Sequence, residues 1–437
     1  MDTRAAHALI RFGFGRAGGQ PLPADPVQWL GLQLAGQDLA PTALQPDPGS
    51  AAAAITLFEL DRTDPPPPGQ PRRSGTLFRT ETGALLQYAL TTDAAFRERL
   101  VWFWANHFTI STRRGMVAPL AGSFVRDAIR PYVTGRFSSM VLAVMRHPAM
   151  LVYLDNAQSA GPNSQAGQRN RRGLNENLAR ECLELHTVTP AAGYTQTDVT
   201  EFARILTGWS IEVKEPPLGF KFRPFLAEPG EKRLLGRSFG EGQQGGVDAL
   251  TFLGDHPMTH RALAVKLARH FITDQPPPEA VRAIEGALRD TRGNLASAYR
   301  AIIAQPAAWK PLQKLRSPFD LTLAAFRAGL PVSGIQAAAE GPLPGVMTAL
   351  GQGLFNAVQP SGWPDVASEW IGPEAMMRRV DWAYGFANRP ELPDPVQMAD
   401  TALGPLLPDR TMADLRQAGS RREGMTLLLA SPEFQRR

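Results

Sequence analysis

The sequence predicts a mainly α-helical protein: a large single-body orthogonal helical array with one small β-hairpin insertion near 220–239. Apolar residues recur at positions i, i+3, i+4 and i+7 through most of the chain, which is the spacing of one face of an α-helix. Paired strand-like runs around a turn, which indicate a hairpin, occur only in that insertion. The 40 glycines and 39 prolines interrupt the helical spacing and indicate many loops.

Each expected helix is a stretch of this spacing that lies between capping or turn residues. Outside the central polar stretch, the expected helices cover 3–12, 26–34, 76–92, 93–106, 119–130, 136–147, 257–271, 278–290, 293–305, 317–329, 343–351, 373–388, 395–404, 410–418 and 421–430. Pro257 stands at the start of its segment, a position that favours the first turn of a helix. The succession of helices predicts a body built by helix-on-helix packing.

Two segments depart from this pattern, so residues 1–437 are expected to form one helical domain with two surface additions. Residues 40–75 are rich in proline and alanine, which indicates a surface excursion with one Ala-rich helix and an extended linker. Residues 212–250 hold the hairpin and a Gly-rich return. The hairpin is expected to pair 220–226 with 233–239 around a Pro-Gly turn.

The composition limits the classes of function. With 43% hydrophobic and 20% charged residues, the 437-residue chain forms a core and is not disordered. The net charge of +5, from 46 basic and 41 acidic residues, is a small excess, and no basic stripe alternates with aromatic residues. This argues against nucleic acid as a partner. The single cysteine, Cys182, excludes an internal disulfide and is expected to be a small buried apolar residue.

The sequence shows neither a membrane span nor a signal peptide. It contains no run of about 18 apolar residues, the length needed to cross a bilayer. The first residues, MDTRAAHALIRFGFGRAGGQ, lack the apolar region of a signal peptide. These features predict a cytoplasmic protein. The alternative is a periplasmic location reached through co-export with a partner.

The segment 174–186 is the densest in residues of chemical interest. Read as an α-helix, it places four polar residues within about 100° of arc: Asn177, Arg180, Glu181 and Glu184. The neighbouring stripe, formed by Leu174, Leu178, Cys182 and Leu185, is apolar and is expected to face the core. The polar residues therefore lie beside the core, where a buried polar site would be built. His186 lies at the end of this helix.

Two interpretations of this helix stay open. Glu176, Arg180 and Glu184 can instead form a ladder of charges four residues apart, which contributes a few tenths of a kcal/mol per pair on an exposed face. A turn at 190–193 follows the helix. Thr195 and Asp198 then predict a capping box at the start of the next helix, although aspartate replaces the usual Glu or Gln.

A second polar candidate lies in the aromatic segment 101–111, VWFWANHFTIS. Trp and Phe dominate this segment, so it is expected to be deeply buried. A histidine among aromatic residues, as His107 is, is usually a hydrogen-bonded core residue, but the adjacent Asn106 favours a polar pocket. His256 and His260 are four residues apart and can present two imidazoles on one helix face, although no glutamate follows in the zinc-protease pattern.

Several segments together resemble a large bacterial family catalogued as domain of unknown function 1800. They are RFGFG, FWANHFTIS, RHPAMLVYLDN, NENLARECLELHT with GYTQTDVTEFARILTGW, HPMTHRALAVKLARHF, SGWPDVASEWI and LLASPEF. They span almost the whole chain in order, and the central combination of ELHT, GYT and LTGW is specific. The resemblance implies a helical architecture and no established activity. It also implies a partner, because members are often encoded beside exported proteins of another uncharacterised family, number 1501.

One hypothesis of function is a hydrolase-like enzyme with a polar or metal site of Glu and His between helices. Carboxylate and imidazole groups suit a divalent metal or a general acid–base pair, and oxidation with bound iron or haem stays open for the same groups. The predicted catalytic residues are Glu181, Glu184, His107 and His186. The predicted substrate-binding residues are Arg180, Asn106 and Asn177, and the predicted metal ligands are Glu181, Glu184 and His256.

The alternative hypothesis is a non-catalytic accessory or chaperone-like partner of an exported protein of the unknown-function family 1501. In that case the same residues form a buried polar network that fixes how the helices pack. The hypotheses differ in geometry, because a network needs only paired polar groups, whereas a site needs a cleft lined by unpaired ones.

Overall fold

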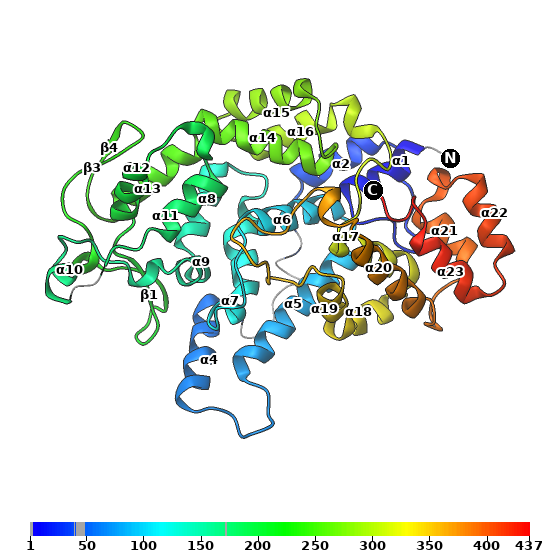
Figure 1. Ribbon diagram of the computed structural model, residues 1–437, viewed down its shortest axis with the longest axis horizontal. Coiled ribbons are helices and arrows are strands. Elements are labelled where there is room, and N and C mark those ends of the chain that lie inside the picture. The colour runs from blue at the N-terminus through cyan, green and yellow to red at the C-terminus, as the bar shows by residue number, and fades with distance from the viewer. Residues whose placement is uncertain (1–2, 39, 41–48, 171–172) are drawn as a thin grey trace.

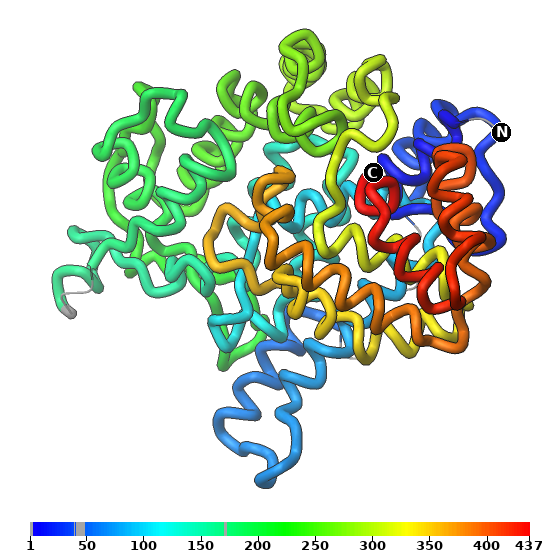
Figure 2. Tube along the Cα trace, turned by 45° about the vertical axis from the view of Figure 1, so that its right-hand side comes forward, coloured from blue at the N-terminus to red at the C-terminus, as the bar shows by residue number. Residues whose placement is uncertain are grey.

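The computed structural model describes residues 3–38, 40, 49–170 and 173–437, and this part of the chain is mainly helical (Figure 1). Within these residues, 22 α-helices and two small antiparallel hairpins form the regular structure, and 62% of the residues are helical. The predicted fold class is therefore confirmed. The two chain ends lie on the same side of the molecule (Figures 1 and 2).

The first third of the chain forms the N-terminal edge, a projecting arm and the centre of the molecule. Its helices are α1 Thr3–His7, α2 Pro26–Ala35, α4 Ala51–Thr63, α5 Arg73–Thr91, α6 Ala95–His107, α7 Val117–Ser123, α8 Phe137–Arg146 and α9 Pro148–Tyr153. Helix α6 carries the aromatic segment and lies near the middle of the view in Figure 1. Its central place follows from its sequence, since both faces of an aromatic-rich helix must be covered.

Helices α4 and α5 form an arm that projects from the body (Figures 1 and 2). Near the start of α4, Ala54 and Ile55 are buried. At the far end of the arm, beside the connecting segment, Asp61 accepts hydrogen bonds from the backbone and side chain of Ser74. Residues 64–72, which connect the two helices, are almost all exposed. Helix α4 and the connecting segment fall in the predicted excursion 40–75, of which 41–48 lie outside the described residues, whereas α5 continues beyond it to Thr91. The loose attachment of 40–75 stays a prediction.

The middle of the chain forms the left side of Figure 1. It contains α10 Gln165–Asn170, α11 Asn177–Glu181, α12 Gln196–Ile205 and α13 Gly242–Gly254, with β1 Trp209–Glu212, β2 Gly219–Phe222, β3 Lys232–Leu234 and β4 Arg237–Phe239. The predicted capping box is confirmed, because Thr195 and Asp198 bond each other's backbone N–H groups at the start of α12.

Two hairpins replace the one expected between 220–226 and 233–239. Strand β1 pairs antiparallel with β2, and β3 pairs antiparallel with β4. Pro224 begins a 3-10 turn two residues after the last residue of β2, and proline cannot donate a ladder hydrogen bond. The first predicted strand therefore ends at Phe222. It pairs with β1, which precedes it in the sequence, and not with the segment that follows it.

The rest of the chain forms the top and right of Figure 1. Its helices are α14 Pro257–Phe271, α15 Pro278–Asp290, α16 Leu295–Ile303, α17 Pro318–Gly329, α18 Val332–Glu340, α19 Pro342–Ala349, α20 Pro373–Phe386, α21 Pro395–Ala402, α22 Asp409–Gln417 and α23 Arg421–Ala430. Between α19 and α20 runs an irregular segment, residues 350–372, with one short 3-10 turn. No helix among the described residues is long and apolar enough to cross a membrane.

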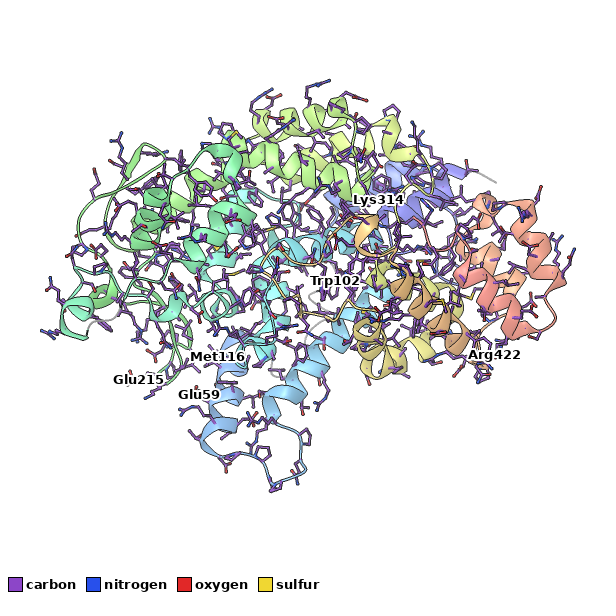
Figure 3. All side chains as sticks on the ribbon, viewed as in Figure 1. Glu59, Trp102, Met116, Glu215, Lys314 and Arg422 are labelled. Carbon is purple, nitrogen blue, oxygen red and sulfur yellow. The ribbon has the colours of Figure 1, made fainter. Side chains whose placement is uncertain are left out.

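Apart from a three-residue cluster of Ala160, Ala166 and Leu226, the described interior divides into two apolar clusters. The larger includes Trp104, Phe271 and Tyr299, and the smaller is built around α17 to α23. Trp102 packs against both clusters and lies near the middle of the molecule (Figure 3). Junctions between apolar bodies are common places for ligand clefts.

Candidate functional site

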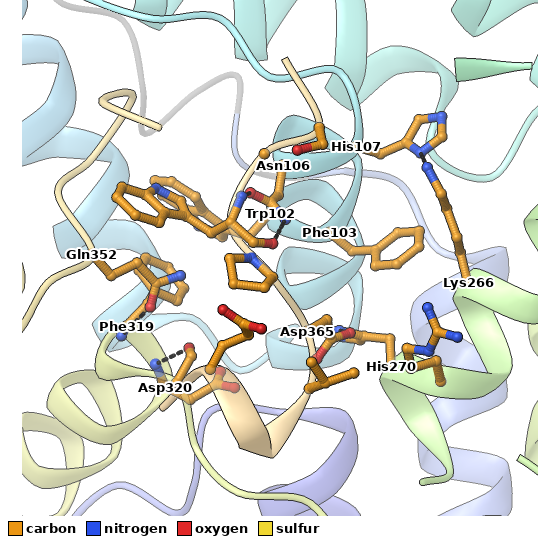
Figure 4. Close-up of a pocket in the computed structure, with 18 of the residues that line it drawn as sticks. Trp102, Phe103, Asn106, His107, Lys266, His270, Phe319, Asp320, Gln352 and Asp365 are labelled. Carbon is orange, nitrogen blue, oxygen red and sulfur yellow. Dashed lines mark hydrogen bonds and ion pairs between the residues drawn. The ribbon is translucent and has the colours of Figure 1, made fainter. Parts of the chain in front are cut away.

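A cleft of about 610 Å³ opens where the two apolar clusters meet (Figure 4). Helix α6, helix α14, the start of α17 and the irregular segment 350–372 supply most of its lining. The volume is in the range of clefts that hold small organic molecules. The family-like segments FWANHFTIS and SGWPDVASEWI both contribute to it, although they are far apart in the sequence.

Helix α6 presents one face to the cleft. Arg99, Trp102, Phe103, Asn106 and His107 all line it, and their spacing of three or four residues brings them to the same side of a helix. This face combines aromatic surface with an amide, a guanidinium and an imidazole. The prediction of a polar pocket beside His107 agrees with this arrangement.

The segment after α19 is fixed to α6 through Asn106. The Asn106 amide nitrogen donates to the Trp363 carbonyl at 2.9 Å, and its oxygen accepts from the Trp363 N–H at 2.8 Å. Gly362 has φ +76°, and a Cβ atom there would lie 2.4 Å from the Asn106 carbonyl oxygen. Asn106 was predicted to bind substrate; here its amide holds the cleft wall in place.

The bottom of the cleft is a buried ion-pair network. Asp320 lies 2.8 Å from Arg99 and 2.9 Å from Arg437. Burial alone would raise the pKa of the Asp320 carboxyl, but the two guanidinium groups lower it below its usual range. Arg99 also donates to the carbonyl oxygen of Gly13 at 2.7 Å. These groups neutralise one another and hold α6, α17 and the N-terminal segment together.

His270 and Asp365 form a close pair beside this network (Figure 4). Nδ1 of His270 lies 2.6 Å from Oδ2 of Asp365, and Lys314 lies 3.2 Å from the other oxygen. Burial lowers the pKa of His270 to about 4, although the negative charge of Asp365 acts to raise it. At neutral pH the imidazole is therefore uncharged, and its Nδ1–H donates to the carboxylate. Its Nε2 faces Arg99 at 3.5 Å, the limit of hydrogen-bonding distance.

Lys266 and His107 meet on the same side of the cleft as His270, which lies one turn further along α14 (Figure 4). Nζ of Lys266 lies 3.3 Å from Nδ1 of His107 and donates to the Leu185 carbonyl at 2.7 Å. Burial and then Arg269 lower the pKa of Lys266 to about 8. Burial, followed by Lys266 and His186, holds the pKa of His107 well below its ordinary value. Among the described residues, no carboxylate forms an ion pair with Lys266.

His186 touches this pair from the protein interior. Its carbonyl oxygen lies 3.2 Å from Nε2 of His107, and its own imidazole is buried against Phe108 and His107. Burial lowers the pKa of His186 to about 3, so the ring is neutral. Two of the predicted catalytic residues, His107 and His186, are therefore in contact, but only His107 reaches the cleft.

The two predicted catalytic glutamates lie elsewhere on the same segment. Glu181 is half-buried and Glu184 exposed. Burial and then the nearby Glu184 raise the pKa of Glu181. Neither carboxylate lines the cleft. Residues 182–186 form a π-helical turn, in which each turn holds more than 3.6 residues. The arc expected from an α-helix is therefore altered there, and convergence of the glutamates with His107 stays a prediction.

The remaining predicted residues occupy the surface of this region or a separate hollow. Arg180 forms an ion pair with Glu176 at 2.8 Å, so this pair of the predicted charge ladder is present. Asn177 is exposed. His256 caps the start of α14, where its Nδ1 accepts from the backbone of Met258, and it lines a smaller hollow beside Arg237.

The described residues contain no group of three or more His, Cys, Asp or Glu side chains that could hold a metal ion. The structure thus offers no metal site made from Glu181, Glu184 and His256, and that site stays a prediction.

The sequence reasoning missed Lys266, Arg269, His270 and Asp365. The first three follow one another at helical spacing on α14, within the segment HPMTHRALAVKLARHF. That spacing of three basic groups on one arc was a usable signal. No sequence signal pointed to Asp365, because the residues around an aspartate in an irregular segment do not indicate which helix it will contact.

These features define a mainly helical protein with a cleft that has an aromatic side, a cationic side and a buried ion-pair network beneath them. The chain belongs to the family described as protein of unknown function (DUF1800), whose model matches residues 7–436. No curated protein and no solved structure matches the chain. The resemblance seen in the sequence motifs is therefore confirmed over almost the whole length.

Proposed function

We propose that the protein is a hydrolase-like enzyme that acts on a small organic anion in the central cleft, with Lys266 as its acid–base group. The observation that carries the proposal is the contact of Lys266 with His107 on the cleft wall, without a carboxylate partner among the described residues. A lysine with a pKa of about 8 is well matched to proton transfer near neutral pH. Perturbed groups in a cleft are good candidates for a functional site.

The neighbouring charges favour an anionic substrate. Lys266 and Arg269 lie three residues apart on α14, and both line the cleft. Of the three acidic side chains that line the cleft, Asp320 and Asp365 are already paired with buried cations. The third, Glu369, is exposed and forms no ion pair with Lys266 or Arg269. A ligand carboxylate or phosphate would supply the missing counter-charge, and Arg269 can bind it with two parallel hydrogen bonds.

The proposed reaction is hydrolysis of an ester. Neutral Lys266 takes a proton from water while the water oxygen bonds to the carbonyl carbon. The bond from that carbon to the leaving oxygen then breaks, and the Lys266 ammonium gives the proton to that oxygen. His107 keeps Nδ1 as an acceptor for Lys266, because its Nε2–H donates to the His186 carbonyl. His107 thereby orients the amine.

The test compares the hydrolysis of p-nitrophenyl acetate and of the mono-p-nitrophenyl ester of succinic acid. We expect faster hydrolysis of the anionic ester and a kcat that rises as the pH passes through about 8. Lys266→Met should abolish the activity, whereas Lys214→Met, at an exposed position, should keep it. Wild-type activity in Lys266→Met, or no hydrolysis of either ester by the wild type, would refute the proposal.

The glutamate site predicted from the sequence is a rival within the same class. Glu181 and Glu184 could share a proton or a divalent cation, since burial and then the nearby Glu184 raise the pKa of Glu181. Loss of hydrolysis in Glu181→Gln together with full activity in Lys266→Met would favour that site over the cleft.

A second candidate function is the accessory role beside an exported protein of family 1501. One observation favours it: Met377, Val380 and Tyr384 lie on successive turns of α20 and are exposed. An exposed apolar stripe is typical of a surface that binds another protein. Co-expression followed by co-purification with the exported protein tests this role, and Met377→Asp should reduce the amount of exported protein recovered. If no exported protein is recovered, or the variant recovers as much as the wild type, this role is refuted.

A further inference from the structure

The side chain of Phe103 lies next to the basic residues of the cleft. Helix α6 meets α14 at two contacts: Nδ1 of His107 lies 3.3 Å from Nζ of Lys266, and the ring centroids of Phe103 and His270 lie 5.1 Å apart. Phe103 and His107 are four residues apart on α6, as are Lys266 and His270 on α14, so each pair lies on one side of its helix. The Phe103 ring therefore lies about one helical turn along α6 from the contact with Lys266, on the same side of the cleft (Figure 4).

Other side chains cover only part of this ring. The ring centroids of Trp104, His270 and Phe271 lie 5.0, 5.1 and 6.4 Å from that of Phe103. Phe103 is still half-buried and lines the cleft, so the rest of its ring is open to a ligand. A second aromatic ring packs well against such a surface, in an offset or edge-to-face arrangement.

A guanidinium group without a partner stands beside this ring. Arg269 directly precedes His270 on α14 and lines the same cleft. In the described part of the chain, no carboxylate forms an ion pair with Arg269, and its buried Nε has no hydrogen-bond partner. A carboxylate binds a guanidinium group through two parallel hydrogen bonds. A carboxylate attached directly to a ring brings its charge to Arg269 and its ring to Phe103, because His270, the neighbour of Arg269, is in contact with Phe103.

We infer that the substrate is an aromatic anion, with its charged group on Arg269 and its ring against Phe103. This inference deepens the proposed function and rests on it for the anionic group. Contact between two aromatic rings raises affinity about two- to tenfold beyond the effect of apolar burial. Lys266, one turn earlier on α14, stays available to the ester group of the substrate.

The experiment measures the affinities of benzoate, cyclohexanecarboxylate and benzamide at pH 7 by calorimetric titration of the full chain. Benzoate and cyclohexanecarboxylate have the same charge and six ring carbons each, but only benzoate is aromatic. We expect benzoate to bind about two- to tenfold more tightly than cyclohexanecarboxylate. Apolar burial alone would favour the saturated ring, which has the larger apolar surface. Benzamide keeps the ring without the charge and should bind at least about tenfold more weakly than benzoate.

The contribution of the Phe103 ring is tested by substitution. Phe103→Leu keeps an apolar side chain and should remove the preference for benzoate over cyclohexanecarboxylate. Phe103→Met replaces this variant if it does not fold, because methionine adapts to irregular gaps. Phe225→Leu is the matched control and should keep the preference, since Phe225 is 45% exposed and does not line the cleft.

Arg269→Gln separates this inference from the proposed function. It should weaken benzoate to about the affinity of benzamide. If both carboxylates bind the wild type equally and more tightly than benzamide does, the ring contact is wrong and the anion site stands. A preference for benzoate that survives Phe103→Leu, or that is also lost in Phe225→Leu, overturns the inference as well. If benzoate binds no more tightly than benzamide, or Arg269→Gln has no effect, the anionic substrate of the proposed function fails together with this inference.

Discussion

The Asp320 carboxylate at the start of α17 lies 2.8 Å from the Arg99 guanidinium of α6, and both side chains are almost completely buried. The second oxygen of the carboxylate lies 2.9 Å from Arg437. One carboxylate thus forms ion pairs with two buried guanidinium groups from distant parts of the chain. These ion pairs at the bottom of the cleft therefore stabilise the fold in addition to lining the cleft.

Asp320→Asn is expected to destabilise the protein strongly. The change leaves two buried guanidinium groups without their carboxylate, and breaking such a pair typically costs about 3–5 kcal/mol. Urea unfolding measures the loss. Asp290→Asn is the control, because Asp290 pairs with Arg289 at the surface, where a pair contributes at most about 1 kcal/mol. Equal unfolding midpoints for Asp320→Asn and the wild type would show that the network does not support the fold.

Stability is expected to fall as the pH drops from about 6.5 toward 4. Burial lowers the pKa of His7 and His270 to about 4, and that of His147 and His186 to about 3. An unfolded histidine titrates near pH 6.5, so below that pH the unfolded state binds protons that the folded state does not. Each such histidine lowers the free energy of unfolding by up to about 1.4 kcal/mol for each pH unit that the pH falls in this range. Urea unfolding at pH 7, 6 and 5 measures the slope.

His147→Asn should make that slope smaller. Nδ1 of His147 accepts from the backbone N–H of Ala149 at the start of α9. Asparagine also caps helices well, so the variant keeps the cap and loses the titrating ring. A slope equal to that of the wild type would mean that His147 is not the neutral buried group described here.

Gly362→Ala is expected to move the segment that carries Trp363 and Asp365. Its φ of +76° disfavours any side chain, and the new Cβ would overlap the Asn106 carbonyl. Gly351→Ala is a matched control, with φ +96° and no atom near its Cβ. Both changes carry the backbone strain of about 1–2 kcal/mol. Only Gly362→Ala should shift tryptophan fluorescence and slow the hydrolysis of the mono-p-nitrophenyl ester of succinic acid. Identical behaviour of the two variants would contradict this.

Limited proteolysis with trypsin is expected to cut the arm first. Arg62 and Arg72 stand at the two sides of its connecting segment, and both are exposed. Exposed loop tips are the usual sites of nicking. Mass spectrometry of the first fragments identifies the cut. First cleavage within 174–208 would instead show that the central polar segment opens more readily than the arm.

Glu181→Gln is expected to leave the hydrolysis of the mono-p-nitrophenyl ester of succinic acid unchanged, because Glu181 does not line the cleft. Thermal stability should stay equal or increase slightly, since the change removes the cost of burying a carboxylate and its repulsion with Glu184, which both raise the pKa of Glu181. The rate of ester hydrolysis and a melting curve measure the two properties. A loss of hydrolysis would place Glu181 at the site after all, as the sequence had predicted.

Local chemistry made much of the fold predictable. The capping box of Thr195 and Asp198 and the helical start at Pro257 depend on groups a few residues apart, so the sequence alone determines them. The same holds for the face of α6 that carries Asn106 and His107, because helical spacing decides which residues share a side. The aromatic content of that helix also correctly indicated a buried position.

The site was only partly predictable, because ion pairs join residues that no local rule connects. His107 could be proposed from its neighbours, but its partner Lys266 comes from α14, 159 residues later. Likewise, 95 residues separate His270 from Asp365. Glu181 and Glu184 looked like a site because an α-helix was assumed beyond Glu181, whereas a π-helical turn follows.

The sequence by itself therefore determined the helical class, the helix starts and the face of α6, since each follows from the preferences of neighbouring residues. Tertiary structure alone decided which charges would meet. Burial removes water from Lys266, His270 and Asp320, and only packing of distant helices brings each of them the partner that its buried charge or polar group requires.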